Sequence, residues 1–333
     1  MGLDFTSSLY LGLRHDSGSL SPWRQLTTGV PGALREPDGA TDVARRLAAL
    51  QGCERATLAA STLHLFVDLL GKRRCALFLD GGAYEIARIG AELARARGAM
   101  VSTFPRHDVA TLSHLLVRAR ARPVVVADGF APGVGPLPLR AYLELVHAHR
   151  GLLVVDDTQA LGVLGPRGGG SLRAQGCAPD ASVALVCSLA KGFGAPLAAL
   201  SASRLVVERF RRESTTLVHS SAPSAAAIAA ARRALDVNDA IGERLRARLR
   251  ALVRRFRERA AVLGLTARGG AFPVQELDVR DPVRVHEELR SHGVEAVLRT
   301  GPRLTFVLTA AHRLEDVDDA LQCVAAAVQR RAA

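Results

Sequence analysis

The chain has 333 residues, 48% of them hydrophobic, which is enough apolar material for one large core and a smaller one. With 23% charged residues a disordered chain is disfavoured, and 4% aromatic residues without an interleaved basic stripe argue against nucleic-acid binding. The net charge of +12 indicates either a solvated, arginine-rich surface or attraction for an anionic partner.

Short apolar runs alternate with helical patterns through the middle of the chain. Such runs between helices of ten or more residues are typical of parallel strands buried on both faces. The sequence therefore predicts an α/β fold with a doubly wound, mostly parallel sheet, on which ligands bind at the carboxyl ends of strands. The predicted strands are Cys75–Leu79, Met100–Phe104, Val124–Ala127, Leu152–Val155, Val183–Cys187 and Leu197–Ser201, and the predicted helices are Ala83–Arg97, Ala110–Arg120 and Leu139–His149.

The C-terminal part predicts a second, smaller α/β unit. A helical pattern without proline runs from Ala225 to about Leu263 and is long enough to bridge two domains. We divide the chain into an N-terminal arm (1–45), a large cofactor-binding domain (46–235) and a small C-terminal domain (236–333). The small domain is expected to contain strands Pro273–Leu277, Glu295–Leu298 and Leu304–Leu308 and helices Pro282–His292 and Leu314–Gln329.

The sequence also bears on location. The N-terminus lacks a basic segment followed by an apolar run, so no secretory signal is expected. The most apolar stretch, Ala181–Val207, contains Lys191 and several glycines, which argues against a membrane span. The cysteines lack CxxC or metal-type spacing and are expected to be small buried hydrophobes in a reducing compartment. We predict a cytoplasmic protein without a metal site.

Two residues that follow predicted strands supply complementary chemistry. Asp156 ends the run Leu152-Leu-Val-Val-Asp156, and Lys191 lies in the turn Ser188-Leu-Ala-Lys-Gly-Phe-Gly194. Small apolar neighbours desolvate the lysine, which favours an amine that attacks an aldehyde. A carboxylate beneath a pyridine ring keeps the ring nitrogen protonated, so that the ring accepts electrons from a carbanion. Either residue alone is more often structural, but in this order and strand context they indicate a pyridoxal-phosphate (PLP) enzyme.

Several motifs carry a resemblance that covers nearly the whole chain. They are Tyr10-Leu-Gly-Leu13, Phe104 with His107-Asp108, Val155-Asp156-Asp157 followed by Gly162–Gly168, Ser188–Gly194, and Leu308-Thr-Ala-Ala-His312. With these motifs the chain resembles the α-oxoamine synthase family, which implies PLP fold type I of the aspartate aminotransferase superfamily.

The resemblance assigns roles at the cofactor site. It implies that Asp156 binds the pyridine nitrogen and that Lys191 binds the cofactor aldehyde and shuttles the α-proton. It also implies that Ser188 bonds the cofactor phosphate, although a serine that bonds its own backbone is the alternative. Ser61 and Thr62 occupy the loop-to-helix position that holds the phosphate, where helix N-terminal amides favour an anion. An ordinary helix cap is the alternative for Ser61.

The resemblance also assigns roles to three further residues. Ser220 and Ser221 lie where the family reaches the phosphate of the partner subunit, which implies a homodimer with shared active sites. Arg299 aligns with the arginine that grips the carboxylate of the amino-acid substrate. A surface arginine is the competing interpretation.

The departures from the family pattern concern the same cavity. Tyr84 stands where the family has a histidine that stacks on the ring, and a phenol can also stack, unless it is merely a core tyrosine. Gln159, which we retain as a catalytic candidate, replaces a histidine and can donate a hydrogen bond but cannot relay a proton near neutral pH. Pro132 falls where a serine is expected, and the stretch before Tyr10 is shorter than in the family. The acyl-donor pocket is therefore expected to be remodelled.

The leading functional hypothesis is a decarboxylative condensation of an amino acid with an acyl thioester, which gives an α-amino ketone. Coenzyme A or an acidic carrier protein would deliver the acyl group, and either would suit the positive net charge. A PLP-dependent aminotransferase that uses the same lysine and aspartate is the alternative. A degenerate, non-catalytic partner subunit is a third hypothesis.

Overall fold

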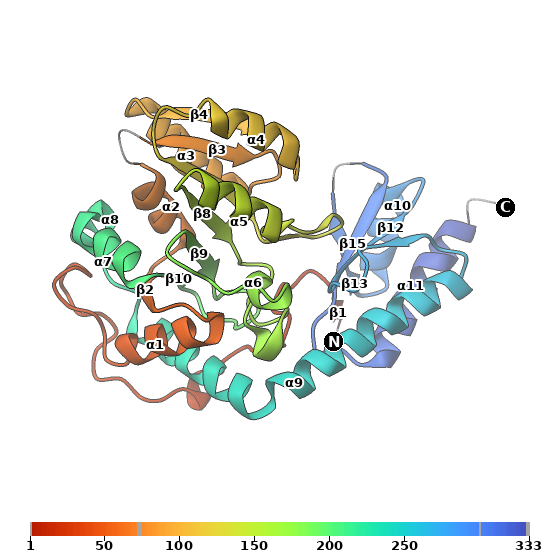
Figure 1. Cartoon of the computed structure of the whole chain (residues 1–333). Coiled ribbons are helices and arrows are strands. Elements are labelled where there is room, and N and C mark those ends of the chain that lie inside the picture. Colours follow the sequence, from red (N-terminus) through yellow and green to blue (C-terminus); the bar gives the residue numbers. More distant parts are fainter. Residues whose placement is uncertain (1, 72–74, 300, 331–333) are drawn as a thin grey trace. The chain divides into compact units, whose positions relative to one another are not determined.

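The computed structural model describes residues 2–71, 75–299 and 301–330, which form two compact units (Figure 1). The larger unit contains the described residues of 14–131 and 136–240, and the smaller unit contains those of 2–13, 132–135 and 241–330. The start of the chain belongs to the smaller unit because β1 (Leu3–Asp4) pairs in parallel with β13 (Val294–Glu295). The boundaries predicted at residues 45 and 235 stay predictions.

The larger unit is built on a sheet of seven strands in the order β2-β10-β9-β8-β5-β3-β4. Strand β10 runs antiparallel to both of its neighbours, whereas β9, β8, β5, β3 and β4 pair in parallel. The predicted mostly parallel sheet is confirmed. The strands are β2 (Arg55–Ala59), β3 (Ala76–Asp80), β4 (Met100–Phe104), β5 (Pro123–Asp128), β8 (Leu152–Asp156), β9 (Val183–Ser188) and β10 (Ala198–Ala202).

Helices cover both faces of this sheet. Successive side chains of a strand point to opposite faces, so each strand contributes to two cores. Leu77 and Leu79 of β3 belong to a core with α2, α3 and α7, whereas Ala76 and Phe78 belong to a second core with α4 and α5. The sheet is therefore doubly wound, as predicted. The helices of this unit are α1 (Ala40–Gln51), α2 (Thr62–Leu70), α3 (Glu85–Ala96), α4 (Val109–Val117), α5 (Leu139–Ala148), α6 (Ser171–Ala174), α7 (Arg204–Glu213) and α8 (Thr215–His219).

The smaller unit contains an antiparallel sheet in the order β11-β12-β15-β14. The single strand predicted at 295–298 is wrong, because the chain changes pairing partner at Ala296. β13 pairs with β1, whereas β14 pairs with β15. The other elements are β11 (Ala267–Arg268), β12 (Val274–Asp278), β14 (Val297–Leu298), β15 (Arg303–Val307), α10 (Pro282–Ser291) and α11 (Leu314–Gln329). The predicted long helix is α9 (Ala225–Val262).

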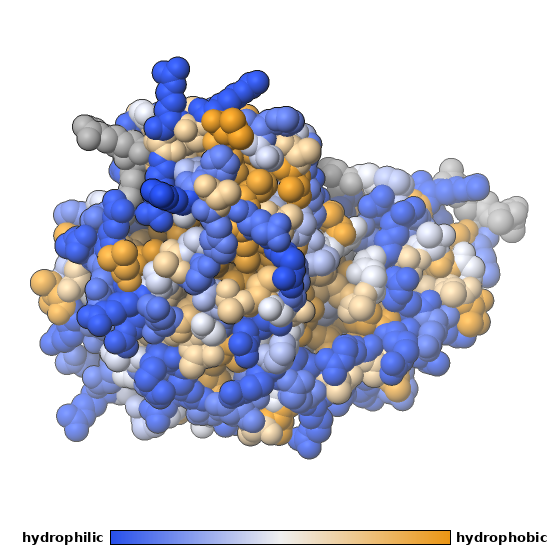
Figure 2. All heavy atoms as spheres, in the orientation of Figure 1, coloured by the Kyte–Doolittle hydropathy of each residue, from blue (hydrophilic) through white to orange (hydrophobic). Residues whose placement is uncertain are grey.

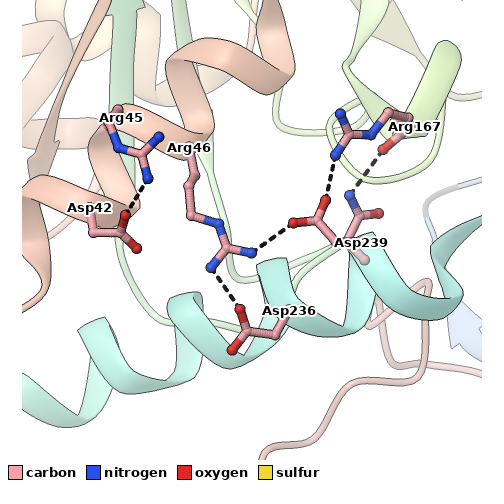
Figure 3. Close-up of polar contacts among 7 residues, drawn as sticks. Asp42, Arg45, Arg46, Arg167, Asp236 and Asp239 are labelled. Carbon is pink, nitrogen blue, oxygen red and sulfur yellow. Dashed lines mark hydrogen bonds and ion pairs between the residues drawn. The ribbon is translucent and has the colours of Figure 1, made fainter.

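A network of ion pairs fixes the loop that follows β8 (Figure 3). Arg46 of α1 contacts Asp236 and Asp239 of α9 at 2.7 and 2.9 Å. Asp239 also accepts a bond of 2.5 Å from Arg167, and the Asn238 amide donates to the Arg167 carbonyl at 3.1 Å. Single exposed ion pairs contribute little, but a connected network restrains the groups it joins. The loop is thus held against α1 and the first part of α9.

Hydrophilic side chains cover most of the face shown in Figure 2. Exposed arginines on helices pair with carboxylates one turn away, as Arg204 does with Glu208 and Arg209 with Glu213. These pairs favour the interpretation of the positive charge as a solvated surface. Among the described residues, no helix is both long enough and apolar enough to cross a membrane.

A buried carboxylate restricts the backbone of the same loop. Asp157 is fully buried and accepts the N–H of Ser171 with both oxygens, at 3.0 and 3.2 Å. Gly170 has a φ of +94°, and a Cβ there would lie 1.8 Å from Asp157 Oδ2. Only glycine fits this position without moving the carboxylate.

Gly170→Ala should therefore lower the free energy of unfolding by about 3 kcal/mol or more, from backbone strain and the clash with Asp157. Gly176→Ala is the matched control, because Gly176 also has a positive φ, +65°, but a Cβ there meets nothing within 4 Å. The control should cost about 1 kcal/mol. Urea unfolding of both variants measures the difference, and equal losses would contradict the role assigned to Asp157.

Candidate active site

A cavity of about 260 Å³ lies in the larger unit at the carboxyl ends of the parallel strands. Its lining residues come from the ends of β5, β8 and β9 and from the starts of α2 and α3. This is the edge of the sheet where a ligand site was predicted. The lining residues are Thr62, Tyr84, Ile86, Asp128, Phe130, Asp156, Thr158, Gln159, Ser188 and Lys191.

Asp156, the last residue of β8, places a buried carboxyl in this cavity. Burial raises the pKa of Asp156, while hydrogen bonds from Thr158 and the positive charge of Lys191 act in the opposite direction. The backbone N–H of Thr158 donates to Oδ1 at 3.0 Å. Burial penalises the charged form of this carboxyl, and a nearby positive charge favours it. A cationic ligand placed here would therefore stabilise the carboxylate and be stabilised by it.

Lys191 reaches the same cavity from the turn between β9 and β10. The turn is closed by backbone bonds from Leu189 N–H to the Leu197 carbonyl, 2.9 Å, and from Ala195 N–H to the Leu189 carbonyl, 3.1 Å. A Cβ at Gly192 would lie 2.4 Å from the Leu161 carbonyl oxygen, so the turn packs too closely for a side chain there. The structure thus brings together the lysine and the aspartate that the sequence singled out.

Tyr84 precedes α3, lines the cavity and is 58% exposed. Lys191 Nζ lies 6.0 Å from the ring centroid, at the outer limit of a cation–π contact. The alternative interpretation of Tyr84 as a core tyrosine is wrong, because the ring is exposed beside the cavity.

The predicted phosphate-binding residues lie at the start of α2 and the end of β9. Ser61 is the residue before α2, and its hydroxyl makes no cap bond but lies 2.8 Å from His64 Nδ1. Thr62, the first residue of α2, lines the cavity, where the helix N-terminus favours an anion. The Ser188 hydroxyl also lines the cavity and accepts the Ala190 N–H at 3.3 Å. The backbone contact that was the alternative for Ser188 is therefore present, and its role at the phosphate stays a prediction.

Three further predicted site residues, Ser220, Ser221 and Arg299, are not among these lining residues. The Ser220 hydroxyl donates to the Thr216 carbonyl at 2.5 Å, and Ser221 forms a bridge with Pro31. Arg299 is exposed in the smaller unit. The roles predicted for these three residues stay predictions. Gln159 is among the lining residues, beside the end of β8.

Sequence reasoning missed two polar residues of the cavity. The Thr158 hydroxyl accepts the Ser188 N–H at 2.9 Å and also bonds Asp156, so it joins the ends of β8 and β9. Asp128 ends β5 and is in register with Asp156 on the neighbouring strand. The signal for Asp128 was available, because it is a carboxylate that directly follows an apolar strand.

Asp128 and Asp156 place two carboxyl groups in one partly enclosed space. Burial and then the neighbouring Asp156 raise the pKa of Asp128 to about 7, with a smaller upward effect from Asp80. The Tyr84 N–H, which donates to Asp128 Oδ1 at 3.0 Å, and Arg106 act in the opposite direction. Asp128 therefore titrates near neutral pH.

The fold and this set of groups define a class, the PLP-dependent enzymes of fold type I. The family model for aminotransferase class I and II matches residues 90–322. The chain belongs to this family and, within it, to the α-oxoamine synthases.

Two of the similar curated proteins are 8-amino-7-oxononanoate synthases. An 8-amino-7-oxononanoate synthase of Alcanivorax borkumensis is 33% identical over 97% of this chain and 88% of its own length. One of Halorhodospira halophila is 36% identical over 68% of this chain. The matched region spans 60% of the length of the Halorhodospira protein.

Solved structures confirm the fold. Serine palmitoyltransferase of Sphingomonas wittichii superposes with a TM-score of 0.88 at 19% identity and covers 99% of this chain and 88% of its own. Another similar structure, with a TM-score of 0.87 and 17% identity over the same shares, is a serine palmitoyltransferase that holds PLP.

Asp128→Asn should stabilise the cofactor-free chain at pH 8. The folded pKa of about 7 lies above the ordinary value, so between about pH 4 and 7 the folded chain keeps a proton that the unfolded chain releases. Wild-type stability is therefore lost as the pH rises through this window. Asparagine does not titrate and keeps an oxygen for the Tyr84 N–H. The gain in unfolding free energy should be smallest at pH 4 and on the order of 1–2 kcal/mol at pH 8.

Urea unfolding between pH 4 and 8 measures this gain, with the exposed Asp42→Asn of α1 as the control. A gain that does not change with pH would contradict the near-neutral titration of Asp128.

Proposed function

We propose that the chain is a PLP-dependent enzyme that condenses an amino acid with an acyl thioester, with loss of carbon dioxide, to give an α-amino ketone. The observation that carries the proposal is the meeting of Lys191 and the buried Asp156 in one cavity. The names of the curated relatives, 8-amino-7-oxononanoate synthases, support this type of reaction over others of the family.

The groups of the cavity fit PLP by their chemistry. Asp156 offers a buried acceptor for a protonated ring nitrogen, and Lys191 offers an amine for an aldehyde. The start of α2 at Thr62, together with Ser188, offers hydrogen-bond donors for a phosphate. When bound, PLP supplies an electron sink that stabilises negative charge at the α-carbon of an amino acid.

The residues of the chain would then perform separate tasks. Asp156 keeps the proton on the ring nitrogen by its negative charge, and Thr158 holds that carboxylate in place. The Lys191 amine takes the proton from the substrate α-carbon at Nζ. The exposed Tyr84 side chain would stack on the cofactor ring, and the Gln159 amide would donate a hydrogen bond to the cofactor. Arg299 is assigned to the carboxylate of the amino acid.

The proposal includes a cytoplasmic homodimer with shared active sites. Support comes from Ser220 and Ser221, which follow α8 and are not among the lining residues of the described cavity. In a dimer they would serve the phosphate of the partner subunit. Light scattering on the purified chain should give twice its 35.3 kDa mass, and a monomer with full PLP affinity would contradict this part of the proposal.

Reduction with borohydride after PLP addition should attach the cofactor to Lys191. Peptide mass spectrometry should find the pyridoxyl group on the peptide that contains Lys191, and Lys191→Ala should abolish both the label and turnover. Label on another lysine would contradict the assigned role.

Free thiol should be released only when amino acid and acyl thioester are both present. Mass spectrometry of products from a mixed pool of amino acids, with coenzyme A and carrier-protein thioesters in separate reactions, identifies the donor. An aminotransferase would instead form a keto acid without any thioester, and that result would overturn the condensation.

A further inference from the structure

Tyr84 is held at the cavity by its backbone rather than by packing around its ring. The residue is 58% exposed, so neighbouring side chains restrain it little. Tyr84 is the residue before α3, with φ −62° and ψ 151°, and its side chain forms no cap bond. The direction of the ring therefore depends on how firmly the start of α3 is fixed.

Asp128 fixes this start to the sheet. Its Oδ1 accepts the backbone N–H of Tyr84 at 3.0 Å, and Asp128 is the last residue of β5. Strand β5 lies between β8 and β3, and Asp128 is in register with Asp156. One side chain thus ties Tyr84 to the strand level that carries Asp156.

The turn before Tyr84 is anchored from its other side. Asp80, buried at the end of β3, accepts the N–H groups of Gly82 and His107 at 2.7 and 2.8 Å and the Tyr142 hydroxyl at 2.8 Å. Arg88 donates to the Gly81 carbonyl at 2.7 Å. These bonds hold residues 81–82, whereas the Asp128 bond acts on Tyr84 itself.

We propose that Asp128 is a positioning residue for cofactor binding, which holds the Tyr84 ring over the cavity through the Tyr84 backbone N–H. The inference rests on the proposed PLP site and goes beyond it. A neutral acceptor oxygen should serve as well as a carboxylate, because the contact needs only the oxygen. Asp128→Asn keeps that oxygen, whereas Asp128→Ala and Asp128→Val remove it.

A double-mutant cycle tests the coupling. The dissociation constant for PLP is measured on the full chain by equilibrium dialysis for the wild type, Asp128→Ala, Tyr84→Ala and the double variant. Loss of one hydrogen bond should weaken binding about 3- to 10-fold when Tyr84 is present. In the Tyr84→Ala background the same change should have less than a twofold effect, because there is no ring to position.

The Asp128→Asn variant and the circular dichroism of bound PLP distinguish a positioning role of Asp128 from a merely structural one. Asp128→Asn should bind PLP within about twofold of the wild type and keep the visible circular dichroism of the bound cofactor, which Asp128→Ala should diminish. Thermal melting of the cofactor-free variants shows whether each is folded, and Asp128→Val replaces Asp128→Ala if the latter is not. Independent, multiplicative losses in the cycle, or an Asp128→Asn variant as weak as Asp128→Ala, overturn the inference.

The same measurements distinguish a failure of this inference from a failure of the proposed function. If wild-type protein does not bind PLP at Lys191, both fall together. If it does and the losses are independent, only the role of Asp128 falls.

Discussion

The burial of two neighbouring carboxyl groups at the carboxyl ends of β5 and β8 is the constraint on which the site depends. Asp156 and Asp128 are in register on adjacent parallel strands, so neither can move away from the other without disturbing the sheet. Burial raises the pKa of both groups, and the Asp156 charge adds to the effect on Asp128. At Asp156, a bound cation would offset the free-energy cost of burying the carboxylate in the cofactor-free chain.

Hydrogen bonds to these carboxyls and beside them fix the positions of the residues around the cavity. Thr158 joins the end of β8 to Ser188 at the end of β9, and Asp128 joins the end of β5 to Tyr84. Each contact runs between a strand end and the segment after a neighbouring strand. The side chains that face the cavity are therefore placed mainly by the sheet.

The sequence predicted the regular part of this fold well, because apolar runs with strand spacing directly report burial on both faces. Strand Met100–Phe104 was predicted with its observed bounds, and Asp156 and Lys191 were found from their position after strands. The antiparallel direction of β10 was not predicted, because strand direction leaves no trace in composition. Asp128 and Thr158 were missed because their importance comes from register and hydrogen bonding between strands distant in sequence. The division of 295–298 into two strands likewise depends on which partner each residue meets.

The antiparallel direction of β10 makes the segment that carries Lys191 a β-hairpin loop between neighbouring strands. Closing such a loop has a low entropic cost, and hairpins form within microseconds. Asp156, 35 positions earlier in the chain, reaches the same cavity through a parallel pairing of β8 and β9, which needs a long crossover and forms slowly. The two halves of the site therefore differ in contact order. During synthesis or refolding, the amine would acquire its local geometry well before a carboxylate stands opposite it.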